Sequence, residues 1–209
     1  MEHRFEEVID NRERLREVIP AASGKAAHKE IDHIDDICRR FIESSPFVLI
    51  TTRGADGLLD ISPKGDPAGF VAVLDEKTLA IPDRLGNNRL DTFENLMVHQ
   101  EVGLMFMIPG HGDTLRVSGT GAVVRDKDLQ KRFTVRGREP NLVLVVTVHE
   151  AFTHCPKAMI RSALWQPEKW PDRSTVPSLA EAMVAHGNLD ISRDQMQEII
   201  INDAAKRLY

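Results

Sequence analysis

The sequence predicts a mainly β fold with added helices, in which antiparallel strands form a barrel and helical segments flank it at both ends. Short runs of β-forming residues follow one another from residue 47 to residue 153, and hairpin signals such as Asp56-Gly57 separate some of them. A single helical pattern, at about 88–98, is inserted between two of these runs. This order favours an antiparallel barrel over alternating βα units.

Two amphipathic helices are predicted before the strands. Residues 4–19 carry apolar side chains at helical spacing, and Pro20 ends that pattern. Residues 25–43 repeat the pattern until Ser44-Ser45-Pro46 interrupts it. Their apolar faces are most simply packing surfaces, against the barrel or against a partner chain.

The barrel itself is predicted to contain seven strands, at residues 47–52, 58–62, 71–74, 79–81, 102–108, 114–125 and 142–153. Residues 102–108 are apolar apart from one glycine, so we expect this strand to be buried on both faces. Residues 63–69 are rich in Pro and Gly and are predicted to form a loop. Residues 126–136 could form a short helix.

Beyond residue 155 the pattern becomes helical. Residues 156–163 could form a short helix, and capping boxes at Ser178–Glu181 and Ser192–Gln195 open two amphipathic helices. We expect these helices to cover the barrel or a dimer seam. The chain is thus predicted as a single domain, 1–209, with N-terminal helices at 1–45, a barrel core at 46–155 and a C-terminal helical tail at 156–209.

The composition excludes several classes of protein. The 209 residues are 42% hydrophobic and 28% charged, which argues against long disorder. The formal net charge of −5 disfavours non-specific nucleic-acid binding, which relies on a basic surface. The first residues lack the apolar stretch of a signal peptide, and no apolar run is long enough to span a membrane. With only two cysteines, we expect a cytoplasmic protein with reduced thiols and no disulfide framework.

The most informative stretch is residues 79–95, which is predicted to form a strand, a polar loop and a helix. Asn87 or Asn88 can cap that helix. Arg89 would add a fork of donors beside the N–H groups that a first helical turn leaves unpaired. Such an arrangement is typical of an anion site. The alternative is a solvated cap that holds no ligand.

Three motifs in order carry a resemblance to a known family. They are Thr-Thr-Arg-Gly-Ala-Asp-Gly at 51–57 continuing into 60–70, the stretch 79–95, and Pro-Gly-His-Gly-Asp-Thr-Leu-Arg-Val-Ser-Gly at 109–119. Over roughly residues 40–165 the chain resembles the FMN-binding split-barrel flavoproteins of the pyridoxamine 5'-phosphate oxidase-like group, and within it a bacterial branch of FMN-dependent enzymes. The resemblance implies an antiparallel, Greek-key-like split β-barrel and FMN as the cofactor. It also implies a homodimer whose flavin sites lie at the subunit interface, and a small-molecule substrate.

The resemblance also suggests which residues hold the phosphate of FMN, a dianion that needs charge-assisted donors. In the family, a basic residue late in the second strand and a polar, basic cluster at the start of the inserted helix do this. Those positions carry over to Lys64, and to Asn88 with Arg89. All the phosphate candidates together are Lys64, Arg84, Asn87, Asn88, Arg89 and Arg116. Each of them alone could be an ordinary surface residue.

For the isoalloxazine ring, the resemblance places Ser62 and Asp83 at strand edges beside it, where the family also uses backbone groups. It places Arg116 near the flavin of the partner subunit. Arg116 lies in an otherwise apolar strand, and a buried charge needs a partner such as a phosphate or a carboxylate. The alternative is an outward-facing residue of an edge strand.

A second polar cluster follows the last strand and consists of Lys157, Arg161, Ser162 and Trp165. Lys157 and Arg161 would share one face of a helix, where two cations are favourable only with an anion between them. The flavin phosphate or an acidic substrate could be that anion, and Trp165 could cover the ring. The alternative is that this cluster only packs the tail against the barrel.

Other chemistries have little support in the sequence. His149 and His154 would point to opposite faces of a strand, and an adjacent His154-Cys155 pair has no usual ligand geometry, so we expect no metal site. The tail has no Arg-x-His motif, and Tyr209 is the sole tyrosine. True pyridoxamine 5'-phosphate oxidases use both features for their substrate, so that specific activity is not expected.

Two functional hypotheses therefore follow from the sequence. The first is an FMN-dependent oxidoreductase that transfers a hydride or electrons between bound flavin and an unidentified small molecule. The second is a non-catalytic protein on the same fold that binds or stores flavin or a related cofactor.

Overall fold

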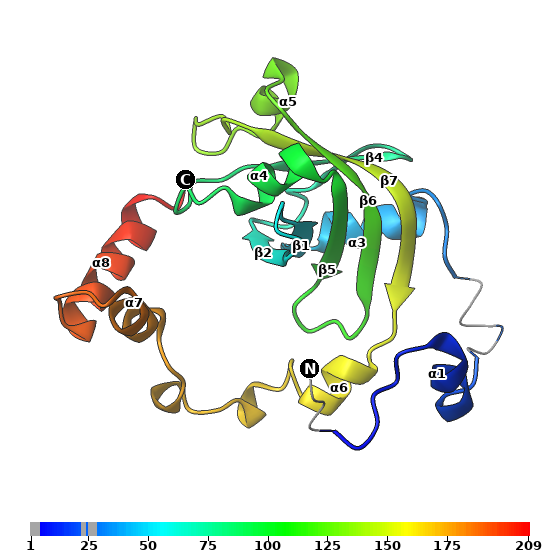
Figure 1. The fold of residues 1–209 in the computed structure, drawn as a ribbon. Helices are drawn as coiled ribbons and strands as arrows, with labels where there is room; N and C mark the ends of the chain where they lie inside the picture. The colour runs from blue at the N-terminus through cyan, green and yellow to red at the C-terminus, as the bar shows by residue number, and fades with distance from the viewer. Residues whose placement is uncertain (1–4, 22–23, 25–28) are drawn as a thin grey trace. The chain divides into compact units, whose positions relative to one another are not determined.

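The structure is a computed structural model, and it describes residues 5–21, 24 and 29–209 (Figure 1). The chain divides into two compact units, Met1–Glu30 and Ile31–Tyr209, which are described separately.

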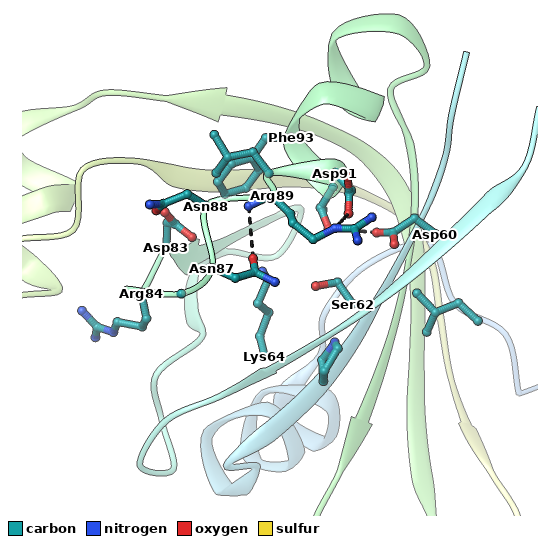
Figure 2. A pocket seen from close by; sticks show the side chains of 15 residues that line it. Asp60, Ser62, Lys64, Asp83, Arg84, Asn87, Asn88, Arg89, Asp91 and Phe93 are labelled. Atoms are coloured by element: carbon teal, nitrogen blue, oxygen red, sulfur yellow. Dashed lines mark hydrogen bonds and ion pairs between the residues drawn. The ribbon is translucent and has the colours of Figure 1, made fainter. Parts of the chain in front are cut away.

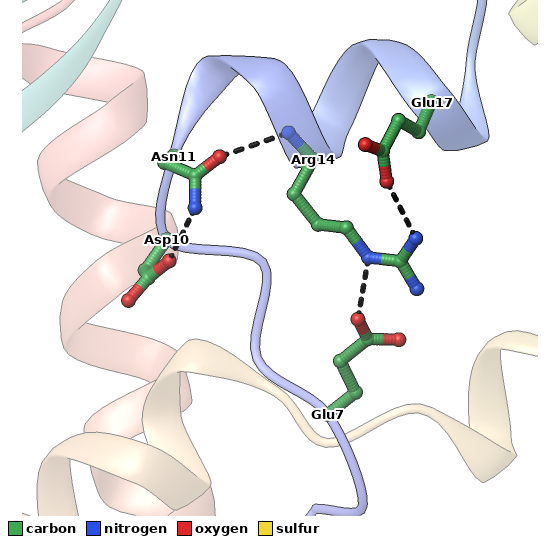
Figure 3. Close-up of polar contacts among 5 residues, drawn as sticks. All are labelled: Glu7, Asp10, Asn11, Arg14 and Glu17. Atoms are coloured by element: carbon green, nitrogen blue, oxygen red, sulfur yellow. Dashed lines mark hydrogen bonds and ion pairs between the residues drawn. The ribbon is translucent and has the colours of Figure 1, made fainter.

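The described part of the first unit contains one helix, α1 (Arg12–Val18). Asn11 caps it by accepting a hydrogen bond of 2.8 Å from the backbone N–H of Arg14. The guanidinium of Arg14 also pairs with Glu7 and Glu17, at 2.6 Å and 2.8 Å (Figure 3). The prediction of a helix over residues 4–19 was therefore too long, because the Asn11 cap sets a later start.

The second predicted helix is also shorter than expected, and its first residues, 25–28, lie outside the described residues. Its helical part is α3 (Asp36–Ser44), which begins after Asp35 accepts a hydrogen bond of 2.8 Å from the N–H of Cys38. Just before it, Ile31 forms an antiparallel bridge with Ala151, with N···O distances of 3.0 Å and 2.7 Å. That pairing with a strand keeps this part of the chain extended.

The second unit is built on one sheet of seven strands, and every neighbouring pair is antiparallel (Figure 1). The strands are β1 (Phe47–Arg53), β2 (Leu59–Gly65), β3 (Ala72–Asp75), β4 (Thr78–Pro82), β5 (Glu101–Met107), β6 (Thr114–Val124) and β7 (Val143–His154). Their order in the sheet is β2-β1-β5-β6-β7-β4-β3. This confirms the prediction of a mainly β, antiparallel fold with helices.

Two details of the strands differ from the predictions. β5 alternates, with Val102, Leu104 and Phe106 buried and the residues between them partly exposed, so it is not buried on both faces. β2 continues through Pro63 to Gly65, where a loop was predicted. This continuation is possible because β2 lies at the edge of the sheet, where a proline is tolerated without a donor.

The main core lies between the sheet and the two helices α3 and α4 (Asp91–Val98). Ile34 precedes α3 and Ile42 lies on it, and both are fully buried, as are Phe106 and Leu144 of the sheet. α4 contributes Phe93 and Leu96 and contacts β1, β2 and β6. Each fully buried side chain of this size stabilises the fold by about 1.5–3 kcal/mol. The core therefore fixes the start of α4 against β2, where the candidate site lies.

The remaining helices lie after β6. They are α5 (Lys127–Arg132), α6 (Lys157–Ser162), α7 (Leu179–Gly187) and α8 (Arg193–Lys206), with two short 3-10 turns, η1 (Pro167–Lys169) and η2 (Arg173–Thr175). Ser178 and Ser192 cap α7 and α8 as predicted, and the capping box at Ser192 is complete. α7 and α8 pack on each other. Among the described residues, no helix combines the length and apolar character that crossing a membrane requires.

Candidate functional site

A cleft of about 220 Å³ lies where β2, the end of β4 and the start of α4 meet (Figure 2). It brings together the predicted residues Ser62, Lys64, Asp83, Arg84, Asn87, Asn88 and Arg89. Asp60, Asp91, Thr92 and Phe93 also line it. Residues of β2 and residues at the start of α4, more than twenty positions apart in the sequence, therefore share one cleft.

Contrary to the prediction from the sequence, the N-terminus of α4 is not capped by Asn87 or Asn88. The residue at the cap position is Leu90, which has a left-handed backbone (φ 58°) and makes no side-chain cap. Asn88 is also left-handed, and the Asn87 side chain instead accepts a hydrogen bond of 3.1 Å from the N–H of Arg89. A left-handed leucine costs about 1–2 kcal/mol. Packing of α4 compensates for such strain, which a local reading of the sequence does not reveal.

Acidic side chains surround the cations of this cleft. The Nε atom of Arg89 lies 2.7 Å from Asp91, and this pair raises the pKa of the guanidinium (Figure 2). The carboxylate of Asp60 accepts a hydrogen bond of 3.1 Å from Thr92. The sequence analysis considered Asp60 only as part of the strand edge that includes Ser62, and it did not name Asp91 for this cleft. The signal for Asp91 was its position two residues after Arg89, at the first residue of α4.

Lys64 and Asp83 form the inner part of the cleft. Burial raises the pKa of Asp83, and the positive charges of Lys64 and Arg84 partly oppose that rise. The Nζ atom of Lys64 lies 6.0 Å from the ring centroid of Phe93, which forms an apolar wall. This corner therefore combines a cation, a carboxyl group that holds its proton more tightly than usual, and an aromatic surface.

Arg84 is engaged elsewhere, although it lines the cleft. Its Nε atom lies 2.6 Å from the carboxylate of Asp66, whose side chain is only 2% exposed. A terminal nitrogen donates to the main-chain oxygen of Phe133 at 2.8 Å. Figure 2 shows the Arg84 side chain directed away from Lys64 and Asn87. The guanidinium thus anchors the loop, and its predicted role as a phosphate ligand stays a prediction.

Arg116 lies in a different hollow, which Thr51, Ser118, Glu150 and Phe152 also line. Its guanidinium carbon is 4.9 Å from the ring centroid of Phe152, a cation–π distance. Within one chain, Arg116 does not line the cleft of Lys64. Its predicted role in the site of a partner subunit stays a prediction.

The cluster after β7 is also separate from the cleft. Lys157, Arg161 and Ser162 lie on α6, and the Ser162 hydroxyl donates to the main-chain oxygen of Met159 at 3.2 Å. The indole N–H of Trp165 donates to the main-chain oxygen of His111 at 2.7 Å. The Ser162 hydroxyl and the Trp165 indole N–H therefore both donate to main-chain oxygens of the protein. Across the part of the chain that the structure describes, no three His, Cys, Asp or Glu side chains gather as a metal site.

Comparison of the sequence with models of known protein families gives one match. A family model described as "Pyridoxamine 5'-phosphate oxidase" matches residues 34–155, which is more than half of the chain. A search of curated proteins gives no match.

Several solved structures are similar in fold. HupZ of Group A Streptococcus has 18% identity and a TM-score of 0.49, over 57% of this chain and 93% of its own. A Clostridium acetobutylicum protein related to general stress protein 26 has 16% identity and a TM-score of 0.42, over 56% and 84%. The heme storage protein HutZ of Vibrio cholerae has 12% identity and a TM-score of 0.40, over 58% and 94%.

Proposed function

This chain belongs to the pyridoxamine 5'-phosphate oxidase family, and from that premise we propose that it is an FMN-dependent oxidoreductase that acts on a small molecule. The observation that carries the proposal is the meeting of Lys64 from β2 and Arg89 from the loop before α4 in one cleft. Two cations from separate segments, with Asn87 and Asn88 beside them, form a donor set suited to a phosphate.

The donor set fits a flavin phosphate despite the neighbouring carboxylates. The ion pair with Asp91 uses the Nε atom of Arg89, and a guanidinium carries four further N–H donors on its terminal nitrogens. The Arg89 side chain is 73% exposed, so it can turn toward a ligand at little cost in packing. Burial raises the pKa of Asp83, and a protonated Asp83 would not oppose the charge of a phosphate.

In this proposal the protein supplies binding and orientation, while bound flavin supplies hydride or electron transfer. Lys64, Arg89, Asn87 and Asn88 hold the phosphate. Phe93 and Ser62 of β2 line the same cleft. Asp83, whose pKa is raised by burial, can hold or release a proton there.

The other predicted residues enter the proposal through a second copy of the chain. We propose a cytoplasmic homodimer in which Arg116 of one subunit faces the flavin of the other. Lys157, Arg161, Ser162 and Trp165 would then line the substrate side of that shared site. The sedimentation coefficient of the purified protein tests the dimer, and a monomer at micromolar concentration would contradict it.

The visible spectrum of the purified protein and titration with FMN test the cofactor. We expect Arg89→Ala to weaken FMN binding by about 1.5–3 kcal/mol, the scale of a hydrogen bond to a charged group. Arg193→Ala is a matched control, because Arg193 is also exposed and pairs with a neighbouring aspartate at 2.9 Å. No FMN binding by the wild type, or equal affinities in Arg89→Ala, would overturn the proposal.

The alternative is a non-catalytic protein that binds or stores flavin or a related cofactor, since one fold can host both roles. Steady-state turnover with a nicotinamide donor or with oxygen separates the two. Pyridoxamine 5'-phosphate itself is not the expected substrate. Tyr209, the sole tyrosine, uses its hydroxyl for a hydrogen bond to Asp66 at 2.6 Å. Production of hydrogen peroxide from pyridoxamine 5'-phosphate would contradict this expectation.

A further inference from the structure

The carboxylate of Asp66 connects two residues that are far apart in the sequence. One oxygen accepts the N–H of Arg84 at 2.6 Å, and the other accepts the hydroxyl of Tyr209, also at 2.6 Å. The Asp66 side chain is almost fully buried. Because a buried carboxylate is costly without hydrogen-bond partners, both bonds help to stabilise it inside the protein.

Tyr209 is fixed by three separate contacts. Besides the hydroxyl bond to Asp66, its main-chain oxygen accepts a hydrogen bond from Arg138. The guanidinium carbon of Arg136 lies 4.9 Å from the centroid of its ring. Bonding to the Asp66 carboxylate also raises the pKa of the tyrosine, so its hydroxyl stays a donor. The segment after α8 is therefore held against the turn between α5 and β7.

This contact lies directly beside the candidate site. Tyr209 lines a hollow of about 390 Å³ together with Asp83, Arg84 and Asn88. Those three residues also line the cleft of Lys64, on the other side of the same loop. A movement of Arg84 would consequently change both sides of the loop.

We propose that Tyr209 is a positioning residue for the cleft, acting through Asp66 and Arg84 to hold the loop of residues 83–90 in place. Without the hydroxyl, one Asp66 oxygen loses its donor, and water or Arg84 must move to satisfy it. The hydrogen bond from the Arg84 guanidinium to the main-chain oxygen of Phe133 would then weaken, and the loop that carries Arg84 would become more mobile. This inference concerns the conformation of the loop, so it does not depend on which ligand the cleft takes.

Hydrogen exchange of backbone amides tests the proposal with Tyr209→Phe, which keeps the ring beside Arg136 and removes only the hydroxyl. The amide of Asp83, bonded to Leu142 at 3.0 Å, reports on the loop. We expect it to exchange roughly two- to tenfold faster, the range that one hydrogen bond gives. Amides between β5 and β6 should not change. Arg207→Ala, which removes an exposed ion pair with Asp203, is the control near the same end.

A double-variant comparison shows whether Tyr209 acts through Asp66. In protein that already carries Asp66→Ala, which removes both acceptor oxygens, adding Tyr209→Phe should change the exchange of the Asp83 amide no further. Arg84→Lys, which removes the Nε donor and keeps the charge, is a second background if Asp66→Ala does not fold. Additive effects in these backgrounds, or unchanged exchange in Tyr209→Phe alone, would overturn the proposal.

FMN titration of the same variants separates positioning from general stability. We expect Tyr209→Phe to weaken FMN binding by roughly two- to tenfold. The Arg207→Ala single variant should bind FMN with the affinity of the wild type. Unchanged FMN affinity in a Tyr209→Phe protein whose wild type binds FMN would show that the hydroxyl does not position the cleft. If the wild type does not bind FMN but the exchange responds, the proposed cofactor fails and the positioning of the loop stands.

Discussion

The guanidinium of Arg89 lies 2.7 Å from the carboxylate of Asp91, across the turn that starts α4. Arg89 is the residue on which the phosphate proposal most depends, so this pair competes with the ligand. Asp91→Asn should therefore tighten FMN binding by about 1 kcal/mol, the upper end for an exposed ion pair. The gain should shrink at high salt, because the Asp91 side chain is 42% exposed and screened. Weaker FMN binding in a titration of Asp91→Asn would contradict this prediction.

The ion pair of Arg84 with Asp66 should matter for stability. Arg84→Ala would remove one of the two side-chain donors of the buried Asp66 carboxylate and leave the Tyr209 hydroxyl bonded to it. We expect the free energy of unfolding to fall by about 3 kcal/mol, the lower end for breaking a buried pair. Urea unfolding measures this change. Arg89→Ala, an exposed arginine of the same loop, should change it by no more than about 0.5 kcal/mol.

Gly119 should not tolerate a side chain. A Cβ atom there would lie 1.9 Å from the main-chain oxygen of Thr147, beside the irregularity in the pairing of β6 with β7. Gly119→Ala must displace backbone, so we expect a loss of about 3 kcal/mol in unfolding free energy, a value high in the range for overpacking. Gly103→Ala is the control, because its Cβ would meet Thr51 at an ordinary 3.8 Å. Equal thermal denaturation midpoints for the two variants would contradict this account.

Asp83 should give the cleft a dependence on pH. Its pKa is raised in the folded protein, mainly by burial, so its contribution to stability is present below the ordinary value of 3.8 and is lost as pH rises through the folded pKa. Lys64→Met removes a charge that lowers this pKa, so the pKa should rise further. Carbon-13 chemical shifts of the side-chain carboxyl groups measure it, with Asp83→Asn for assignment. A midpoint at or below 3.8 in the wild type would contradict the prediction.

The sequence by itself determined the antiparallel sheet. Alternating apolar residues and turn signals located the seven strands within a few residues, because strand periodicity is a local property. Lys64 and Arg89, which the resemblance suggested as phosphate ligands, line one cleft, and their role there stays a prediction. Helix lengths were less accurate at the N-terminal end, where Asn11 and Asp35 set later starts than the apolar pattern suggested.

Only the tertiary structure decided with which groups the charged side chains pair. Arg84 was predicted from the sequence as a phosphate ligand, a role that stays a prediction. In the structure it binds Asp66, eighteen residues away, and Tyr209 binds the same carboxylate from 143 residues away. The left-handed backbone of Leu90 likewise depends on how α4 packs. These pairings depend on the distances between segments that are remote along the chain, and on burial, which determines which charges must be paired. A local pattern of residues contains neither the distances nor the burial.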